Sequence, residues 1–158
     1  MRRHVYFYTL LDRQFDVAAD LLSGDASGWL PPPAESAGEG ESWHVDLTAD
    51  GAMRAGVATM PALVRVGEPS RFDDHLLRAI RWQARTAERL FPVLEADVDL
   101  RRLDGSGCHL SLTGTYRPPL SVVGGMGDLL LGHRVAEACV RRFVLDIASR
   151  LAVPASGR

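Results

Sequence analysis

The stretch from residue 128 to residue 151 constrains the fold of this chain more than any other. It contains no proline, and its apolar residues recur every three or four positions, which is the spacing of one face of an α-helix. Such a helix would be roughly 36 Å long, enough to cross a small domain. Its face needs an apolar partner layer, and most of the preceding chain predicts strands. The apolar positions are Leu129, Ala136, Val140, Phe143, Ile147 and Leu151.

Apolar and polar residues alternate in several short runs, which is typical of half-buried strands. In the run 90–103, every second residue from Leu94 to Leu100 is apolar. The stretch 75–84 has a composition compatible with a helix, but its alternation favours a strand. The expected strands cover residues 4–11, 43–48, 53–66, 75–84, 90–103 and 108–116.

Breaker residues predict how two of these strands are connected. Asp50 and Gly51 form a dipeptide typical of a two-residue hairpin turn, because both positions there need a positive φ. Pro61 cannot donate a backbone hydrogen bond, so it predicts an edge strand or a bulge.

The amino-terminal part of the chain predicts two short helices. Residues 14–22 have helical spacing, with Asp12 as the expected N-cap. A second helical turn is expected at Trp29 and Leu30, ahead of three consecutive prolines. Residues 31–42 include an acidic stretch without large apolar side chains, which predicts a flexible loop.

The order of these elements predicts an α+β fold. One strand, two short helices, about six antiparallel strands and a long C-terminal helix follow one another without strand-helix-strand alternation, so a parallel sheet is not expected. A curved antiparallel sheet that holds one helix would leave a cavity between them, and such cavities bind small molecules.

Composition fits one soluble domain over residues 1–158, with a disordered tail at 152–158. Hydrophobic residues make up 46% and charged residues 24% of the chain, which is ordinary for a globular protein. The net charge is −2 without a block of like charge, so no nucleic-acid partner is expected. The chain has no apolar run of about 18 residues, and charges interrupt the amino terminus. We therefore expect no membrane span, no signal peptide and a cytoplasmic location.

Two groups of potentially reactive side chains have structural interpretations. Cys108 and Cys139 lie in a predicted strand and helix without metal-ligand spacing, so buried free thiols are expected. The carboxylates at 95, 97 and 99 alternate with apolar residues, which favours a solvated sheet face over a metal site. No metal and no cofactor are expected.

The segment before the long helix is rich in glycine at 124, 125 and 127. It lacks the lysine and hydroxyl residue of a phosphate-binding P-loop, so a flexible corner is expected there. Arg117 and Asp128 are placed to form a structural ion pair at this corner.

Four segments in the second half of the chain match a known pattern. They are IRWQA (80–84), LFPVLEADVDL (90–100), LSLTGTYRPPL (110–120) and GHRVAEACVRRFVLDIASRL (132–151). On these segments the chain resembles the START-like superfamily, also called SRPBCC, and in particular an uncharacterised actinobacterial branch. The resemblance covers most of residues 76–151, while the first 75 residues match only in element order. It implies a helix-grip fold, with a seven-stranded sheet around the long helix and a hydrophobic pocket.

Three polar residues are predicted to point into this pocket. His133 shares a helix face with Ala136 and Val140, and could bind a ligand carbonyl, act as a general base, or be a satisfied core histidine. Arg78 shares strand parity with Trp82 and would need a carboxylate or an acidic ligand, unless it reaches water. Tyr116, like Trp82, is either a pocket wall or a core aromatic. The candidate lining is Arg78, Ile80, Trp82, Leu94, Leu110, Leu112, Tyr116, His133, Ala136 and Val140.

The superfamily includes lipid carriers, hormone receptors, cyclases and chaperone activators, so the resemblance implies no single activity and assigns no catalytic residue. Because the inward positions are mainly aliphatic or aromatic, we expect binding of a small hydrophobic or lipid-like molecule. Two alternatives remain. One is a polyketide cyclase, aromatase or dehydratase that uses an acid or base such as His133. The other is a protein-interaction module without a ligand. A homodimer is compatible with any of the three.

Overall fold

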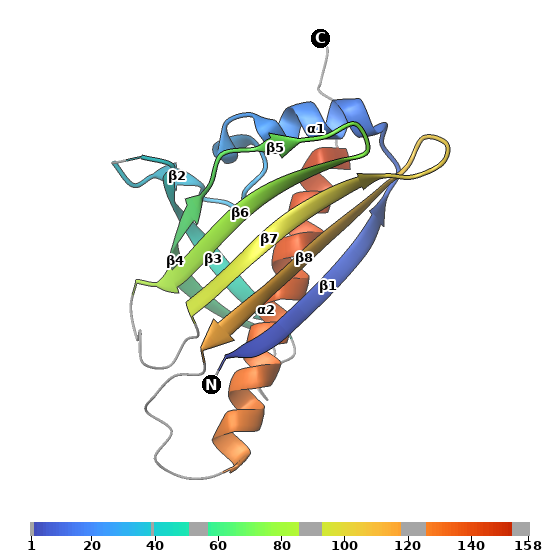
Figure 1. The fold of residues 1–158 in the computed structure, drawn as a ribbon. Coiled ribbons are helices and arrows are strands. Elements are labelled where there is room, and N and C mark those ends of the chain that lie inside the picture. The colour runs from blue at the N-terminus through green and yellow to red at the C-terminus, as the bar shows by residue number, and fades with distance from the viewer. Residues whose placement is uncertain (1, 39, 51–56, 86–92, 118–125, 153–158) are drawn as a thin grey trace.

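Figure 1 shows the computed structural model, which describes residues 2–38, 40–50, 57–85, 93–117 and 126–152. The long carboxy-terminal helix is held by an antiparallel sheet. In chain order the elements are β1 (Arg3–Leu11), α1 (Phe15–Ser23), the 3-10 turn η1 (Ala26–Gly28), β2 (Glu35–Ser36), β3 (Ser42–Asp50), β4 (Val57–Val66), β5 (Ser70–Arg71), β6 (His75–Ala84), β7 (Val93–Arg102), β8 (Cys108–Arg117) and α2 (Met126–Ala152).

Within the described residues the strands form one eight-stranded sheet in the order β1-β8-β7-β6-β4-β3-β2, with β5 beside β6. Every pairing is antiparallel, as expected for an α+β chain without crossover helices. The expected total was about seven strands. The eight strands of the described residues are six long ones and the two-residue strands β2 and β5, which the sequence did not predict.

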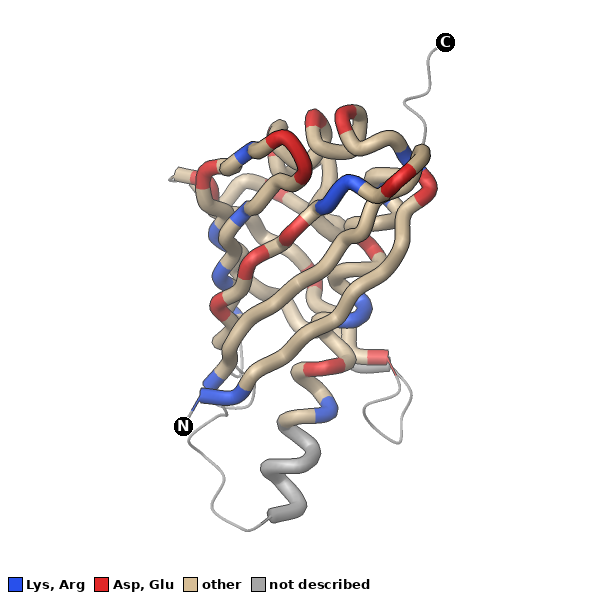
Figure 2. The backbone as a smooth tube through the Cα atoms, turned by 45° about the vertical axis from the view of Figure 1, so that its right-hand side comes forward, with Lys and Arg blue, Asp and Glu red and all other residues tan. Residues whose placement is uncertain are grey.

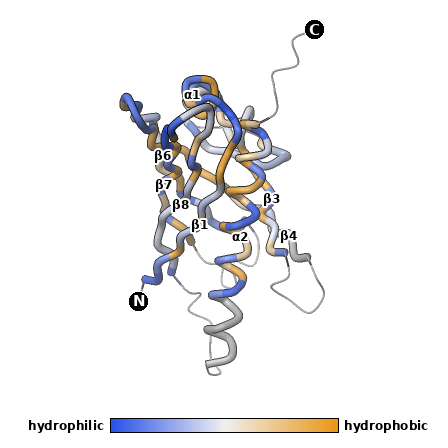
Figure 3. Tube along the Cα trace, turned by 90° about the vertical axis from the view of Figure 1, so that its right-hand side faces the viewer, coloured by the Kyte–Doolittle hydropathy of each residue, from blue (hydrophilic) through white to orange (hydrophobic). Residues whose placement is uncertain are grey.

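The sheet curves around α2, which lies between the β1–β8 side and the β3–β4 side (Figure 3). The helix packs on β1, β3 and β8. Its periodic apolar face is buried as predicted, and each such side chain contributes about 1.5–3 kcal/mol when fully removed from water. The buried residues of α2 are Ala136, Cys139, Val140, Phe143, Val144, Ile147, Ala148 and Leu151.

The alternation that predicted the strands also predicted their faces. Every second residue of β7 from Leu94 to Leu100 is buried. In β8 the predicted lining residues Leu110, Leu112 and Tyr116 are buried, but Ser111, which alternation would place on the outer face, is buried too.

The amino-terminal expectation was partly wrong. Helix α1 begins at Phe15, and Gln14 occupies the N-cap position without a side-chain hydrogen bond, so Asp12 is not the cap. In place of a second short helix there is the single 3-10 turn η1, where the Asp25 carboxylate accepts from the backbone N–H of Ser27 at 2.9 Å. Few residues separate the end of α1 from the prolines, so a turn fits and a helix does not.

The connection between β3 and β4 also differs from the expectation. Asp50 is the last residue of β3 and pairs with Val57, so Asp50 and Gly51 do not form the predicted two-residue turn. Strand β4 lies between β3 and β6 rather than at an edge. Pro61 is tolerated because the ladder between β4 and β6 ends one residue away, where Ala62 faces Ala84.

Some expectations fall on positions outside the described residues. These are the glycines at 124 and 125, the side chain of Asp128 as a partner of Arg117, and the tail from 153 to 158. The segment 31–42 contains the short strand β2, which pairs with β3. Among the described helices, none combines the length and hydrophobicity needed to span a bilayer.

Candidate functional site

Most residues predicted to line a pocket lie on α2 or on the inner face of the sheet, but Arg78 is bonded to the end of α1 and the turn after β4 rather than to α2. All of them are buried except His133, which is partly exposed. Leu110, Leu112 and Val140 have no surface that water can touch (0%), so no water-sized void adjoins these three. As ligand contacts the residues stay a prediction; in the structure they pack into the core.

One row of this inner face is close to an end of the sheet. Cross-strand pairing places Trp82, Leu94 and Tyr116 side by side on β6, β7 and β8, and we call these three residues the end row. The amino-terminal part of α2 extends beyond the sheet at this end (Figure 1). The Trp82 ring meets the Phe143 ring of α2 edge to face, with centroids 5.0 Å apart.

The indole N–H of Trp82 is buried and has no hydrogen-bond acceptor among the described residues. A buried donor without an acceptor costs about 1–3 kcal/mol. The end row therefore contains a donor whose hydrogen bond the described protein does not supply.

Tyr116 joins the sheet to the helix through a polar contact. Its hydroxyl makes a short hydrogen bond with Nδ1 of His133, and the His133 Nε2 lies 2.9 Å from Oε1 of Glu137, one helical turn further on. These partners assign the histidine proton to Nε2 when the ring is neutral, which leaves Nδ1 to accept from Tyr116. Burial raises the pKa of the Tyr116 hydroxyl, so the tyrosine is a neutral donor at neutral pH.

This Tyr116–His133–Glu137 chain connects three proton-carrying groups by polar contacts. A histidine oriented by two partners in this way is the geometry found where a side chain acts as a general acid or base. The sequence predicted that Tyr116 and His133 point into one pocket, but Glu137, which is exposed, was not among the candidate residues. The signal was present, because residues four apart on a helix are neighbours.

Arg78 has partners other than the predicted carboxylate or acidic ligand. Its Nε donates to the carbonyl of Gly67 at 3.0 Å, and one Nη donates to the carbonyls of Leu22 and Gly24 at 2.8 and 2.7 Å. The guanidinium also lies 5.4 Å from the Trp29 ring centroid. Burial lowers the pKa of Arg78. These contacts tie the end of α1 and the turn after β4 to β6.

A groove of about 470 Å³ runs along α2 beside β1 and next to the end of β3. Phe7 and Ala138 are its apolar part, and both are half-buried. Glu137 belongs to this groove as well as to the proton chain. The remaining lining residues are Tyr6, Asp50, Arg134 and Arg141.

The cysteines and carboxylates offer no further reactive site among the described residues. Cys108 and Cys139 are both buried and free, as expected, and burial raises the pKa of Cys139 to about 12. Within the part of the chain that the structure describes, no three His, Cys, Asp or Glu side chains are placed to hold a metal ion.

Comparison with known proteins finds likeness in structure and not in sequence. No family model and no curated protein matches the sequence. Zhui aromatase/cyclase from Streptomyces sp. R1128 superposes with a TM-score of 0.61 at 18% identity over 99% of each chain. A conserved protein from Geobacillus kaustophilus gives 0.55 at 16% identity, covering 96% of this chain and 95% of the other. Ara h 8.0201 gives 0.55 at 10% identity, covering 96% and 98%. Identities this low show a shared fold alone.

Proposed function

We propose that this helix-grip protein binds a hydrophobic or amphipathic small molecule between α2 and the sheet, at the end row of Trp82, Leu94 and Tyr116. The observation that carries the proposal is the makeup of that wall. It is apolar except for the unpaired Trp82 indole N–H and the Tyr116–His133 pair. Ligand pockets typically combine apolar walls with a few polar groups that orient the ligand.

The bound molecule would lie at the end row, near the edge of the space between α2 and the sheet, rather than in the deeper interior. Leu110, Leu112 and Val140 fill the deeper interior, whereas His133 is partly exposed. The apolar part of the ligand would pack on Leu94 and the aromatic edge of Trp82. An oxygen of the ligand would accept from the Trp82 N–H or bond to the Tyr116 hydroxyl.

Native mass spectrometry of protein purified from its own host tests this proposal. We expect one small molecule per chain. The Tyr116→Phe variant should weaken its binding by about three- to tenfold, the effect of one lost hydrogen bond. Tyr8→Phe makes the same change on an exposed side chain and should bind as the wild type does. Protein that repeatedly carries no small molecule would rule the proposal out.

The proton chain favours a second candidate, an enzyme of the cyclase, aromatase or dehydratase kind. His133 held between Tyr116 and Glu137 is what proton abstraction from a bound carbonyl compound would need. Turnover of the recovered ligand, followed by mass spectrometry, is the test. Glu137→Gln keeps the shape of the site, so binding with a rate reduced at least about tenfold would support catalysis, and an unchanged rate would exclude this role.

A further inference from the structure

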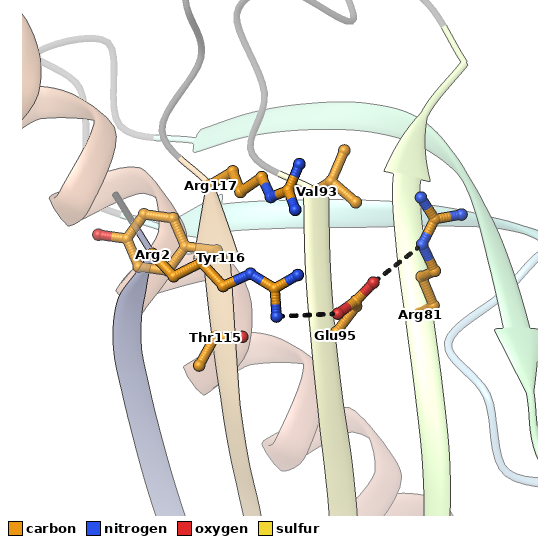
Figure 4. Close-up of a pocket in the computed structure, with 7 residues that line it drawn as sticks. All are labelled: Arg2, Arg81, Val93, Glu95, Thr115, Tyr116 and Arg117. Atoms are coloured by element: carbon orange, nitrogen blue, oxygen red, sulfur yellow. Dashed lines mark ion pairs between the residues drawn. The ribbon is translucent and has the colours of Figure 1, made fainter.

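The outer face of the sheet, which points away from α2, has a pocket of about 160 Å³. Figure 4 shows three guanidinium groups on this face, those of Arg2, Arg81 and Arg117, with the Glu95 carboxylate between Arg2 and Arg81. Thr115, Val93 and Tyr116 complete the lining. Side chains of neighbouring strand residues point to opposite faces of the sheet. The Tyr116 ring therefore belongs to the inner site, and only the part of Tyr116 close to the backbone borders this pocket.

Strand register brings these charges together from four neighbouring strands, since Arg2 directly precedes β1 and the others lie on β6, β7 and β8. Arg81 faces Glu95, and Glu95 faces Thr115, across β6, β7 and β8. Arg3 pairs with Tyr116, so Arg2, the preceding residue, lies beside Arg117. Like charges on neighbouring positions of a sheet repel each other, and this pair is therefore unfavourable unless an anion lies close by.

Glu95 does not neutralise the cluster. Its two carboxylate oxygens lie 3.6 Å from Nη1 of Arg2 and from Nε of Arg81, too far for strong hydrogen bonds. The three side chains are about half exposed, at 53%, 45% and 52% for Arg2, Arg81 and Glu95, so these ion pairs contribute little. Arg117 makes no ion pair with any described residue.

The pocket thus holds three positive charges and one negative charge, although the whole chain has a net charge of −2. Figure 2 shows basic positions beside the amino terminus, at this end of the sheet, and both basic and acidic positions elsewhere on the molecule. This excess of two positive charges is equal in magnitude, and opposite in sign, to the charge of a phosphomonoester dianion.

We propose that this outer pocket binds the phosphate group of a phosphomonoester. Guanidinium groups match phosphate oxygens with paired N–H donors, and the Thr115 hydroxyl adds a neutral donor on the same face. The group could belong to a soluble phosphomonoester or to a lipid headgroup such as that of phosphatidic acid. The site is independent of the inner ligand site, so failure of either proposal leaves the other intact.

Inorganic phosphate is the probe for the first test. The Nε–H signals of Arg2, Arg81 and Arg117 are followed by NMR during titration at constant ionic strength maintained with sodium chloride. We expect saturable shifts of these signals. Shifts no larger than those produced by chloride would overturn the proposal.

Three variants make the test specific. Arg117→Gln should weaken phosphate binding by about fivefold, the scale of one exposed charge interaction. Glu95→Gln removes the only acid among the described residues of the pocket and should strengthen binding by a similar factor. Arg101→Gln alters another outer-face arginine, paired with Asp99 at 2.9 Å, and should change nothing. An equal effect of Arg101→Gln and Arg117→Gln would indicate diffuse charge attraction and contradict a defined site.

Vesicles identify the source of the phosphate group. If wild-type protein, but not Arg117→Gln, sediments with phosphatidic acid vesicles and not with phosphatidylcholine vesicles, the pocket binds a lipid headgroup. Saturable phosphate shifts without sedimentation assign the site to a soluble phosphomonoester.

Discussion

Arg78 shows how a buried charge can be satisfied without a counter-ion. Its guanidinium donates to three backbone carbonyls, those of Leu22, Gly24 and Gly67. Arg78→Met would leave these acceptors without their donor in a closed interior. We expect a loss of about 2–4 kcal/mol in the free energy of unfolding, measured by urea denaturation.

Arg81→Met on the same strand is the matched control. Arg81 is about half exposed, and its pairing with Glu95 at 3.6 Å is loose, so the expected change is within about 0.5 kcal/mol. Arg78→Met also tests the hypothesis from the sequence that Arg78 binds an acidic ligand. That hypothesis fails if Arg78→Met folds and binds every ligand acid as tightly as the wild type.

Cys139 makes the stability of the fold sensitive to alkaline pH. Burial raises the pKa of this thiol from 9.0 to about 12 in the folded chain. Below pH 9 the Cys139 thiol is protonated in both the folded and the unfolded chain, so its full contribution to the stability of the fold is present. Above pH 9 the unfolded chain releases its proton first, so stability falls as the pH rises toward 12.

Between about pH 8 and pH 11 the wild type should therefore lose about 2–3 kcal/mol more stability than Cys139→Ala does. Urea denaturation at a series of pH values measures the two slopes. Parallel slopes for the two proteins would mean that the thiol titrates alike in both states.

At the scale of elements, Gly114 controls how closely β8 approaches β7. A Cβ built there would lie 2.5 Å from the Cβ of Ala96 and 2.6 Å from the carbonyl oxygen of Glu95. Gly114→Ala should therefore destabilise the fold by about 2–4 kcal/mol. Gly28→Ala meets no atom within 4 Å and should be nearly neutral. Thermal unfolding of the two variants compares these sites, and equal midpoints would contradict the close approach.

Local alternation and helical spacing predicted the elements that have one buried face. The strand at 75–84 matches β6 in both bounds, and α2 extends only a residue or two beyond the predicted ends. Predictions based on short signals were less successful. Asp12 as a cap, the two-residue turn at Asp50 and the edge strand at Pro61 all depended on chain partners that a local pattern does not specify.

The residues of the candidate site were also predicted only in part. Strand and helix periodicity predicted that Tyr116 and His133 would both point into the space between sheet and helix, and the structure adds that they are hydrogen-bonded to each other. The partners of Arg78 are backbone carbonyls, which carry no signature in the sequence, and residues 22 and 24 are more than 50 positions away. The outer cluster of Arg2, Arg81 and Arg117 was missed because it depends on the register of four neighbouring strands.

At the scale of the whole molecule, the two proposed sites lie on opposite faces of the sheet and differ in chemistry. The inner end row meets α2, while the outer face carries the arginine pocket. Strand β1 is an edge of the sheet, and Tyr6, Tyr8 and Leu10 are exposed along it. These three side chains are the feature that an interaction module would use, so the absence of any small ligand would direct attention to β1.

Because α2 and the sheet form the inner site only when the whole chain is folded, a bound ligand should stabilise the entire molecule. A ligand at a hundred times its Kd adds about 2.7 kcal/mol, which corresponds to roughly 5–10 °C in Tm for a chain of this size. Stripping the purified protein of its ligand should lower Tm by this amount, and adding the molecule back should restore it. Tyr116→Phe should show a smaller difference, and Tyr8→Phe the full one. If the protein as purified and the stripped protein have the same Tm, no ligand is bound between α2 and the sheet.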